Sequence, residues 1–250
     1  MNMTWMKLDQ APFNDLRVRR AMAMATNWHD LVAANAWAHG HGVPNPAIPA
    51  AFHDWSIPLS DLPPEGRALY DHNIPEAKRL LAEAGYPNGF STPVETTAGY
   101  GTDYMDGVQA TLANWKAAGI ETELKLKEYG AFLASTLVGK FEKLAVGLFG
   151  SWTDPDSYLY RLYVPGQPSN VGGVDDPKLT EMIKLQRRTF DTRKRREIIF
   201  DIQRYLSKQV YYHYGPSFKV VVAWDAAVKN FAPNIGHDYG GRLMAAWLDR

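Results

Sequence analysis

The chain offers few groups whose spacing suits metal binding or catalysis, and its histidines are the first to consider. His39 and His41 flank a single glycine, and with His29 or His53 nearby they are candidate ligands for a transition metal. They lie in a loop rich in glycine and proline, and no carboxylate stands beside them at a helical spacing. We therefore interpret them as solvent-exposed side chains, and we expect neither a metal nor another cofactor.

Carboxylates are the second group with possible chemistry. Asp103, Asp106, Asp154 and Asp156 are candidates for the acid and the base of a glycoside hydrolase, but nothing in the sequence pairs them. The sequence has no H-E-x-x-H, G-x-S-x-G, phosphate-loop or G-x-G-x-x-G pattern, and the segment 150–152 lacks the second glycine of a nucleophile elbow. We expect no catalytic residues and no enzyme, and a hydrolase with scattered carboxylates remains an alternative.

The strongest candidate for a binding site follows an apolar run. Residues 144–149 are continuously apolar, which predicts a buried strand, and Ser151, Trp152, Thr153 and Asp154 come after it. Open α/β sheets place their ligands at the carboxyl ends of their strands. The Trp152 indole can stack on a planar or apolar part of a solute, and backbone N–H groups around it can hold an anion or a carbonyl. An alternative role for Asp154 is to cap the next helix or turn.

Composition excludes several classes of partner. The 250 residues are 46% hydrophobic and 22% charged, as in a globular protein, and 27 basic residues balance 27 acidic ones. No basic surplus therefore indicates nucleic acid, and the basic run 193–196 is interpreted as the solvated start of a helix. There is no cysteine, and no stretch predicts a membrane span or a targeting signal.

Periodicity predicts alternating helices and strands, which is an α/β fold. One helix begins near Asn14 or Asp15, and its basic side chains Arg17, Arg19 and Arg20 are expected to face mostly away from the core. A second begins at Asn73 and stops at a glycine. The other predicted elements are a short helix at 28–38, a helix that ends at 119, a strand at 120–127, a helix at 131–138, a strand at 144–149, two helices around 179–186 and 196–206, and a strand-like end at 210–224.

Five separated motifs resemble those of one protein family. They are PFNDLRVRRAM at 12–22, AKRLLAEAGYPNGF at 77–90, WTDPDSYL at 152–159, NVGGVDDP at 170–177 and RREIIFDIQRYL at 195–206. In this order, and spread over nearly the whole chain, they resemble the bacterial extracellular solute-binding proteins called family 5. That family contains dipeptide, oligopeptide, nickel and opine binders of ABC importers.

The resemblance implies one lobe of a two-lobed periplasmic binding protein, of type II and similar to dipeptide-binding proteins, with the N-terminal lobe absent. It divides the chain into a hinge strand at 1–9, a second α/β lobe at 10–209 and a tail at 210–250 that crosses back to the first lobe. The implied partners are a small-molecule or peptide solute, the permease subunits of an ABC transporter and the missing N-terminal lobe. The implied location is the periplasm or the extracellular face, for a parent protein that is secreted or lipid-anchored.

Two departures from the family pattern affect the expected solute. Peptide-binding members carry an aspartate between this tryptophan and the DPD triplet, where it pairs with the peptide amine, but here only Thr153 separates Trp152 from Asp154. Where oligopeptide binders have arginine three residues before the tryptophan, this chain has Phe149. We therefore expect a sugar conjugate, an opine or a metal chelate rather than a free-amine dipeptide. The weaker candidates for the site are Asn170 and Tyr212.

Two further expectations concern the rest of the parent protein. Some relatives are the ligand-sensing part of a transcription regulator, which is an alternative to transport. The strand-forming segment 211–224 would reach toward a lobe that this chain lacks, and unpaired strand edges recruit partners. We therefore expect self-association through the terminal strands, or disorder of the last ~20 residues.

Overall fold

The computed structural model describes residues 2–34, 42–44, 47–150, 152, 154–218, 223–231 and 244–249. The strands are β1 (Asn2–Met6), β2 (Gly42–Val43), β3 (Phe90–Thr97), β4 (Ile120–Lys127), β5 (Leu144–Leu148), β6 (Tyr212–Tyr214), β7 (Ser217–Phe218), β8 (Val228–Lys229) and β9 (Trp247–Leu248). The α-helices are α1 (Leu16–Ala25), α2 (Trp28–Ala33), α3 (Pro64–Arg67), α4 (Ile74–Glu83), α5 (Thr102–Ala117), α6 (Tyr129–Ser135), α7 (Asp156–Tyr163), α8 (Pro177–Arg187) and α9 (Thr192–Gln209). Short 3₁₀ turns are η2 (Leu59–Asp61), η3 (Ala68–Tyr70), η4 (Ala98–Tyr100) and η5 (Thr136–Val138).

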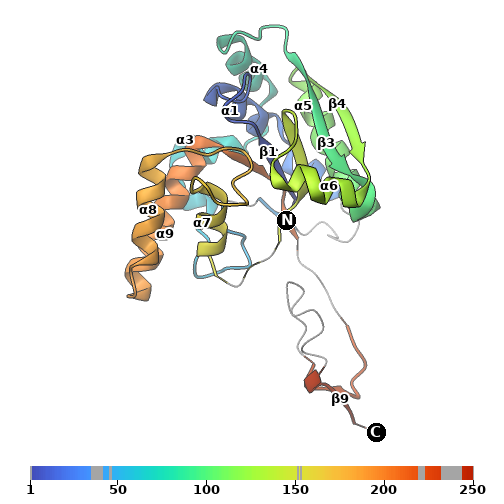
Figure 1. The fold of residues 1–250 in the computed structure, drawn as a ribbon, viewed down its shortest axis with the longest axis vertical. Helices are drawn as coiled ribbons and strands as arrows, with labels where there is room; N and C mark the ends of the chain where they lie inside the picture. Colours follow the sequence, from blue (N-terminus) through green and yellow to red (C-terminus); the bar gives the residue numbers. More distant parts are fainter. Residues whose placement is uncertain are drawn as a thin grey trace.

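A mixed five-stranded sheet of order β4-β3-β5-β1-β6 forms the centre of the fold (Figure 1). β3 pairs in parallel with β4 and β5, whereas β1 runs antiparallel to β5 and β6. The carboxyl ends of β3, β4, β5 and β6 therefore lie at the same edge of the sheet as the start of β1. The predicted α/β fold is confirmed, and strands 120–127 and 144–149 do belong to one sheet, although β3 lies between them.

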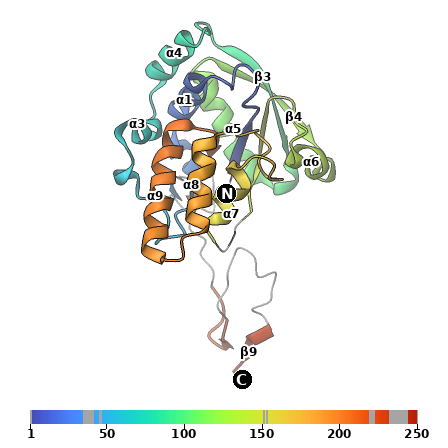
Figure 2. The ribbon, with the colours of Figure 1, turned by 60° about the vertical axis from the view of Figure 1, so that its left-hand side comes forward.

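Helices cover both faces of this sheet. Leu144 and Val146 of β5 belong to a core shared with α1, α4 and α5, while Ala145 belongs to a core shared with α7, α8 and α9. Successive side chains of a strand point to opposite faces, so these two cores lie on opposite sides of the sheet. Figure 2 shows α8 and α9 side by side in the layer that carries α7.

The sequence pattern missed β3, and two of its residues explain why. Pro93 is unusual in a central strand, but β5 pairs with β3 only at Val94 and Glu95, so β3 has no partner on that side at Pro93. Glu95 is 6% exposed, an unusual burial for a carboxylate. Lys127 lies 2.5 Å from it and Thr136 donates a hydrogen bond to it, and these contacts hold its pKa below the usual value although burial opposes them.

The helix starts follow local chemistry. The Asp15 side chain accepts a hydrogen bond from the backbone N–H of Arg17, and that of Asn73 accepts one from the N–H of Glu76. The expected outward direction of Arg19 is wrong, because this side chain is only 6% exposed. It donates to the carbonyl oxygens of Phe13, Gln209 and Val210, at 2.7, 3.1 and 3.0 Å. The end of α9 needs such donors for its last carbonyls.

The predicted hinge strand and the start of the predicted tail lie in the same sheet as strands of the predicted lobe. β1 and β6 are adjacent strands, with Thr4 opposite His213. After β6 the chain pairs as β7 with β2, and β8 pairs with β9 in a hairpin that lies away from the helices and the main sheet (Figure 1). The division at 1–9, 10–209 and 210–250 stays a prediction, as does self-association through the terminal strands. Among the described residues, no helix combines the length and apolar character needed to cross a membrane.

His213 is a buried titratable group within β6. Its Nε2 atom lies 2.9 Å from the Thr26 hydroxyl, which donates its own proton to the Met22 carbonyl. The imidazole must therefore be the donor in the bond to Thr26. The Trp28 ring stacks near the imidazole at a centroid distance of 5.9 Å, and the Trp115 ring meets it edge-on at 5.7 Å. Burial among these groups lowers the pKa of His213 to about 4, so the ring is neutral at pH 7.

This burial predicts a pH-dependent stability. The unfolded chain takes up a proton on His213 near pH 6.5 and the folded chain only near pH 4, so protonation favours the unfolded state between these values. The free energy of unfolding should lose about 1.4 kcal/mol per pH unit from this group as the pH falls through that window. Urea unfolding of the wild-type chain and His213→Gln at pH 7, 6 and 5 measures the difference. Parallel pH profiles for the two proteins would contradict the assignment.

Candidate ligand-binding site

Two loops form the edge of the sheet at which β3 and β5 end. The first is η4, where the Thr97 side chain accepts a hydrogen bond from the Gly99 N–H at 3.1 Å. The Tyr129 ring lies so close to Gly99 that a Cβ atom there would be 2.6 Å from Cδ2 of the ring. Gly101, at φ 95°, then turns the chain into α5. Glycines thus let this loop pass under an aromatic surface made by Tyr100 and Tyr129, whose ring centroids are 5.4 Å apart.

The second loop follows β5 and contains Trp152. The backbone N–H of Trp152 donates to the Tyr158 hydroxyl at 3.1 Å, and the guanidinium of Arg161 lies 4.1 Å above the indole. Phe149, at the end of the strand, adds a third ring at a centroid distance of 6.3 Å from the indole. The half-buried indole therefore contacts Phe149, just after β5, and Arg161 of α7, and it is suited to form one wall of a binding site.

Asp154 ties the same loop to α9. Its carboxylate accepts two hydrogen bonds from the Arg195 guanidinium, at 2.7 and 3.2 Å, and one from the Asp156 N–H at 2.8 Å. Burial works against ionisation, but these donors prevail and lower the pKa of Asp154. Asp156 lies 3.3 Å from Arg187 and accepts a hydrogen bond from Gln186. Both aspartates thus have arginine partners on the α8–α9 hairpin.

The remaining predicted site residues either bond to other parts of the lobe or lie outside the residues that the structure describes. Tyr212 is 3% exposed, and its hydroxyl donates to the Leu162 carbonyl at 2.7 Å and lies 3.2 Å from the side-chain oxygen of Asn170. The Asn170 side chain also bonds both the N–H and the carbonyl of Val174, so these two residues hold the chain that leads to α8. Their contact with a solute stays a prediction. The residues Ser151, Thr153, His39 and His41 lie outside the described residues.

Two residues near Trp152 were not singled out from the sequence. Tyr158 and Arg161 are three positions apart in α7, so they lie on one face of that helix, and both contact the tryptophan. This spacing was the signal that could have found them. Within the described ranges, no cluster of three or more histidine, aspartate or glutamate side chains has the geometry to hold a metal ion.

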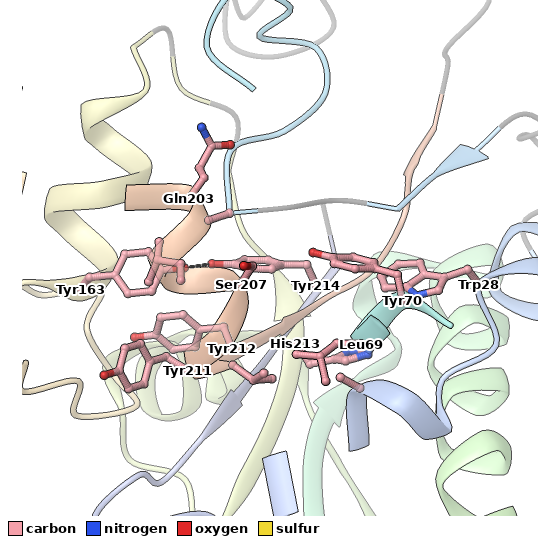
Figure 3. Close-up of a pocket in the computed structure, with 14 residues that line it drawn as sticks. Trp28, Leu69, Tyr70, Tyr163, Gln203, Ser207, Tyr211, Tyr212, His213 and Tyr214 are labelled. Carbon is pink, nitrogen blue, oxygen red and sulfur yellow. Dashed lines mark hydrogen bonds between the residues drawn. The ribbon is translucent and has the colours of Figure 1, made fainter. Parts of the chain in front are cut away.

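A small hollow lies beside β6 and is shown in Figure 3. The hydroxyls of Tyr163 and Tyr214 are hydrogen-bonded to each other, and the Tyr70 and Trp28 rings continue the row toward α2. The space among these rings is about 50 Å³, well below the several hundred Å³ of ordinary ligand pockets. We interpret it as a packing gap of the core rather than as a solute site.

The mixed sheet, with helices on both faces and loops gathered at one edge, has the architecture of periplasmic binding proteins. The family model described as "Bacterial extracellular solute-binding proteins, family 5 Middle" matches residues 1–170, and the chain belongs to this family. The resemblance found in the sequence motifs is thereby confirmed.

The matching proteins are named for different ligands. Heme-binding protein A of Haemophilus influenzae is 31% identical over 173 residues, which are 66% of this chain and 28% of that protein. The structure of DppA from Helicobacter pylori in complex with peptide STSA matches with a TM-score of 0.78 at 22% identity, over 100% of this chain and 47% of that one. The structure of AgaA from A. tumefaciens R10 in complex with agropinic acid matches with a TM-score of 0.73 at 25% identity, over 87% and 43%. The chain thus spans less than half the length of each of these proteins.

The Asp154–Arg195 pair predicts a measurable coupling. Because Arg195 grips the carboxylate with two hydrogen bonds, we expect Asp154→Asn and Arg195→Gln each to lower the free energy of unfolding by on the order of 1 kcal/mol, with non-additive effects. The pKa of Asp154 is lowered on folding, so the coupling should be present above about pH 4 and lost as the pH falls below that value.

A double-mutant cycle by urea unfolding at pH 7 measures this coupling. The exposed pair Asp201–Arg204, at 2.7 Å on one face of α9, is the matched control and should couple by less than about 0.5 kcal/mol. Additive effects of Asp154→Asn and Arg195→Gln would show that the pair does not fasten the loop.

Proposed function

We propose that the chain is one lobe of a solute-capture protein that serves an ABC importer and closes on its solute together with a second lobe. The observation that carries this proposal is the position of Trp152, half-buried just after the carboxyl end of β5 and held by two residues of α7. Membership of family 5 and the fold shared with DppA and AgaA support it. Closure of two lobes would supply the remaining contacts and exclude water from the site.

Binding without catalysis agrees with the chemistry of this loop. A hydrolase needs one carboxyl group poised as an acid and another as a base or nucleophile. Asp154 is paired with Arg195, and its pKa is lowered. Burial raises the pKa of Asp156, but that carboxyl is held by Arg187 and Gln186, so both groups are engaged within the lobe. The relatives that match are solute-binding proteins, and we propose that this chain has the same kind of role.

The same pairs support a solute other than a free-amine dipeptide. Relatives of this fold are named for heme, a peptide or agropinic acid, so side chains at the edge rather than the fold must select the solute. The Asp154 carboxylate beside Trp152 is engaged by Arg195 and is not free to bind an amine. We propose an opine, a sugar conjugate or a metal chelate as the solute, and the permease subunits of the importer as the protein partner. The proposed location is the periplasm or the extracellular face.

Trp152→Ala tests the site. In the chain combined with a first lobe of the same family, calorimetry against dipeptides, opines, sugar conjugates and heme should find one solute class that binds in a saturable manner. Truncation of an aromatic anchor costs about 2 kcal/mol or more, so Trp152→Ala should weaken this binding at least tenfold. Phe190→Ala, which removes a 95% exposed ring on the α8–α9 turn, is the control and should leave affinity unchanged. Tight dipeptide binding that survives Trp152→Ala would overturn both the site and the solute class.

A further inference from the structure

We propose that Arg161, stacked on Trp152, is the anion-binding group of this site, and that the solute presents a carboxylate or another anionic oxygen group to it. The proposal rests on the proposed function and deepens it, because it names the chemistry that the site selects.

Arg161 differs from the two arginines that hold the aspartates of this loop. Asp154 is neutralised by Arg195, and Asp156 by Arg187, at 2.7 and 3.3 Å. Arg161 lies further along α7, with its guanidinium over the Trp152 ring. No acidic side chain among the described residues forms an ion pair with Arg161.

The guanidinium of Arg161 has the chemistry of an anion-binding group. Its central carbon lies 4.1 Å from the indole centroid, within the range of a cation–π contact. Its N–H donors lie in the guanidinium plane and form a rigid fork that matches the two oxygens of a carboxylate or phosphate. Stacking on Trp152 also restricts the side chain before the solute arrives, which reduces the ordering cost of binding.

Closure of the site would make this charge selective. Arg161 is only partly exposed already, and a second lobe placed over Trp152 would remove more of its water. Burial of an unpaired cation is costly, whereas burial of a hydrogen-bonded ion pair recovers much of that cost. A solute with an anionic group would therefore stabilise the closed state, and a neutral or cationic solute would not. This agrees with the engagement of Asp154, whose carboxylate is held by Arg195.

Nuclear magnetic resonance on the 250-residue chain tests this with two isosteric probes. N-benzoylglycine carries a ring for the aromatic wall and a carboxylate for Arg161, and N-benzoylglycinamide replaces the charge with an amide. We expect the acid to shift the Arg161 Nε–H and Trp152 indole N–H resonances with a dissociation constant on the order of millimolar, and the amide to bind at least tenfold more weakly. Benzyl phosphate, as a third probe, distinguishes a phosphate-bearing solute from a carboxylic acid by which anion binds more tightly.

Two variants of Arg161 distinguish the effect of its charge on binding from the effect of its forked shape. Arg161→Gln should lose at least tenfold in affinity for the acid, and Arg161→Lys should lose less because it keeps the charge without the fork. Arg188→Gln, on the exposed α8–α9 turn, is the matched control and should bind as the wild type does. Circular dichroism and thermal unfolding of each variant check that the fold is intact.

Two results would overturn the role of Arg161. If the acid and the amide bind equally, Arg161→Gln has no effect and Trp152→Ala abolishes binding, the anion subsite is wrong while solute capture at Trp152 stands. If the wild-type chain binds neither acid nor phosphate at millimolar concentration, the anion subsite is also wrong. In that case the proposed function is decided separately, by the calorimetric screen with both lobes present.

Discussion

Antiparallel pairing of β1 with β5 on one side and with β6 on the other holds together segments from opposite ends of the sequence. β5 is also joined in parallel to β3, so this ladder fixes which strand ends share an edge. The loops after β3 and β5 meet there because both strands run in the same direction. Without β1, β6 would be cut off from the sheet, and β5, which leads into the Trp152 loop, would keep only its short pairing with β3.

Three buried titratable groups in this sheet and in α1 are matched to specific donors and acceptors. Glu95 has Lys127 and Thr136, His213 has Thr26, and Arg19 has the last carbonyls of α9. Each of these contacts joins elements that are distant in sequence, and an unmatched partner would cost more than the bond contributes. Such contacts specify the register of β3 and β6 more strongly than apolar packing, which tolerates small shifts.

The loop after β5 is firmly anchored, and it lies beside Arg161 through the stack on Trp152. Two aspartate–arginine pairs fasten the start of α7 to the α8–α9 hairpin, so the loop is anchored independently of any solute. Because these pairs use up the carboxylates, Arg161 is left as the group whose charge has no acidic partner among the described residues. The same electrostatic arrangement therefore stabilises the lobe and biases the site toward anions.

The sequence by itself determined features that depend on a few neighbouring residues: the caps at Asp15 and Asn73, the apolar run of β5 and the place of Trp152 just after it. It did not reveal β3, whose proline and buried glutamate are acceptable only beside particular strands. The partners of Asp154, the burial of Arg19 and the stack of Arg161 on Trp152 were likewise decided by tertiary structure. Periodicity and capping act over one or two helical turns. The partner of a charged side chain, by contrast, can come from any segment that the fold places next to it, however distant in sequence.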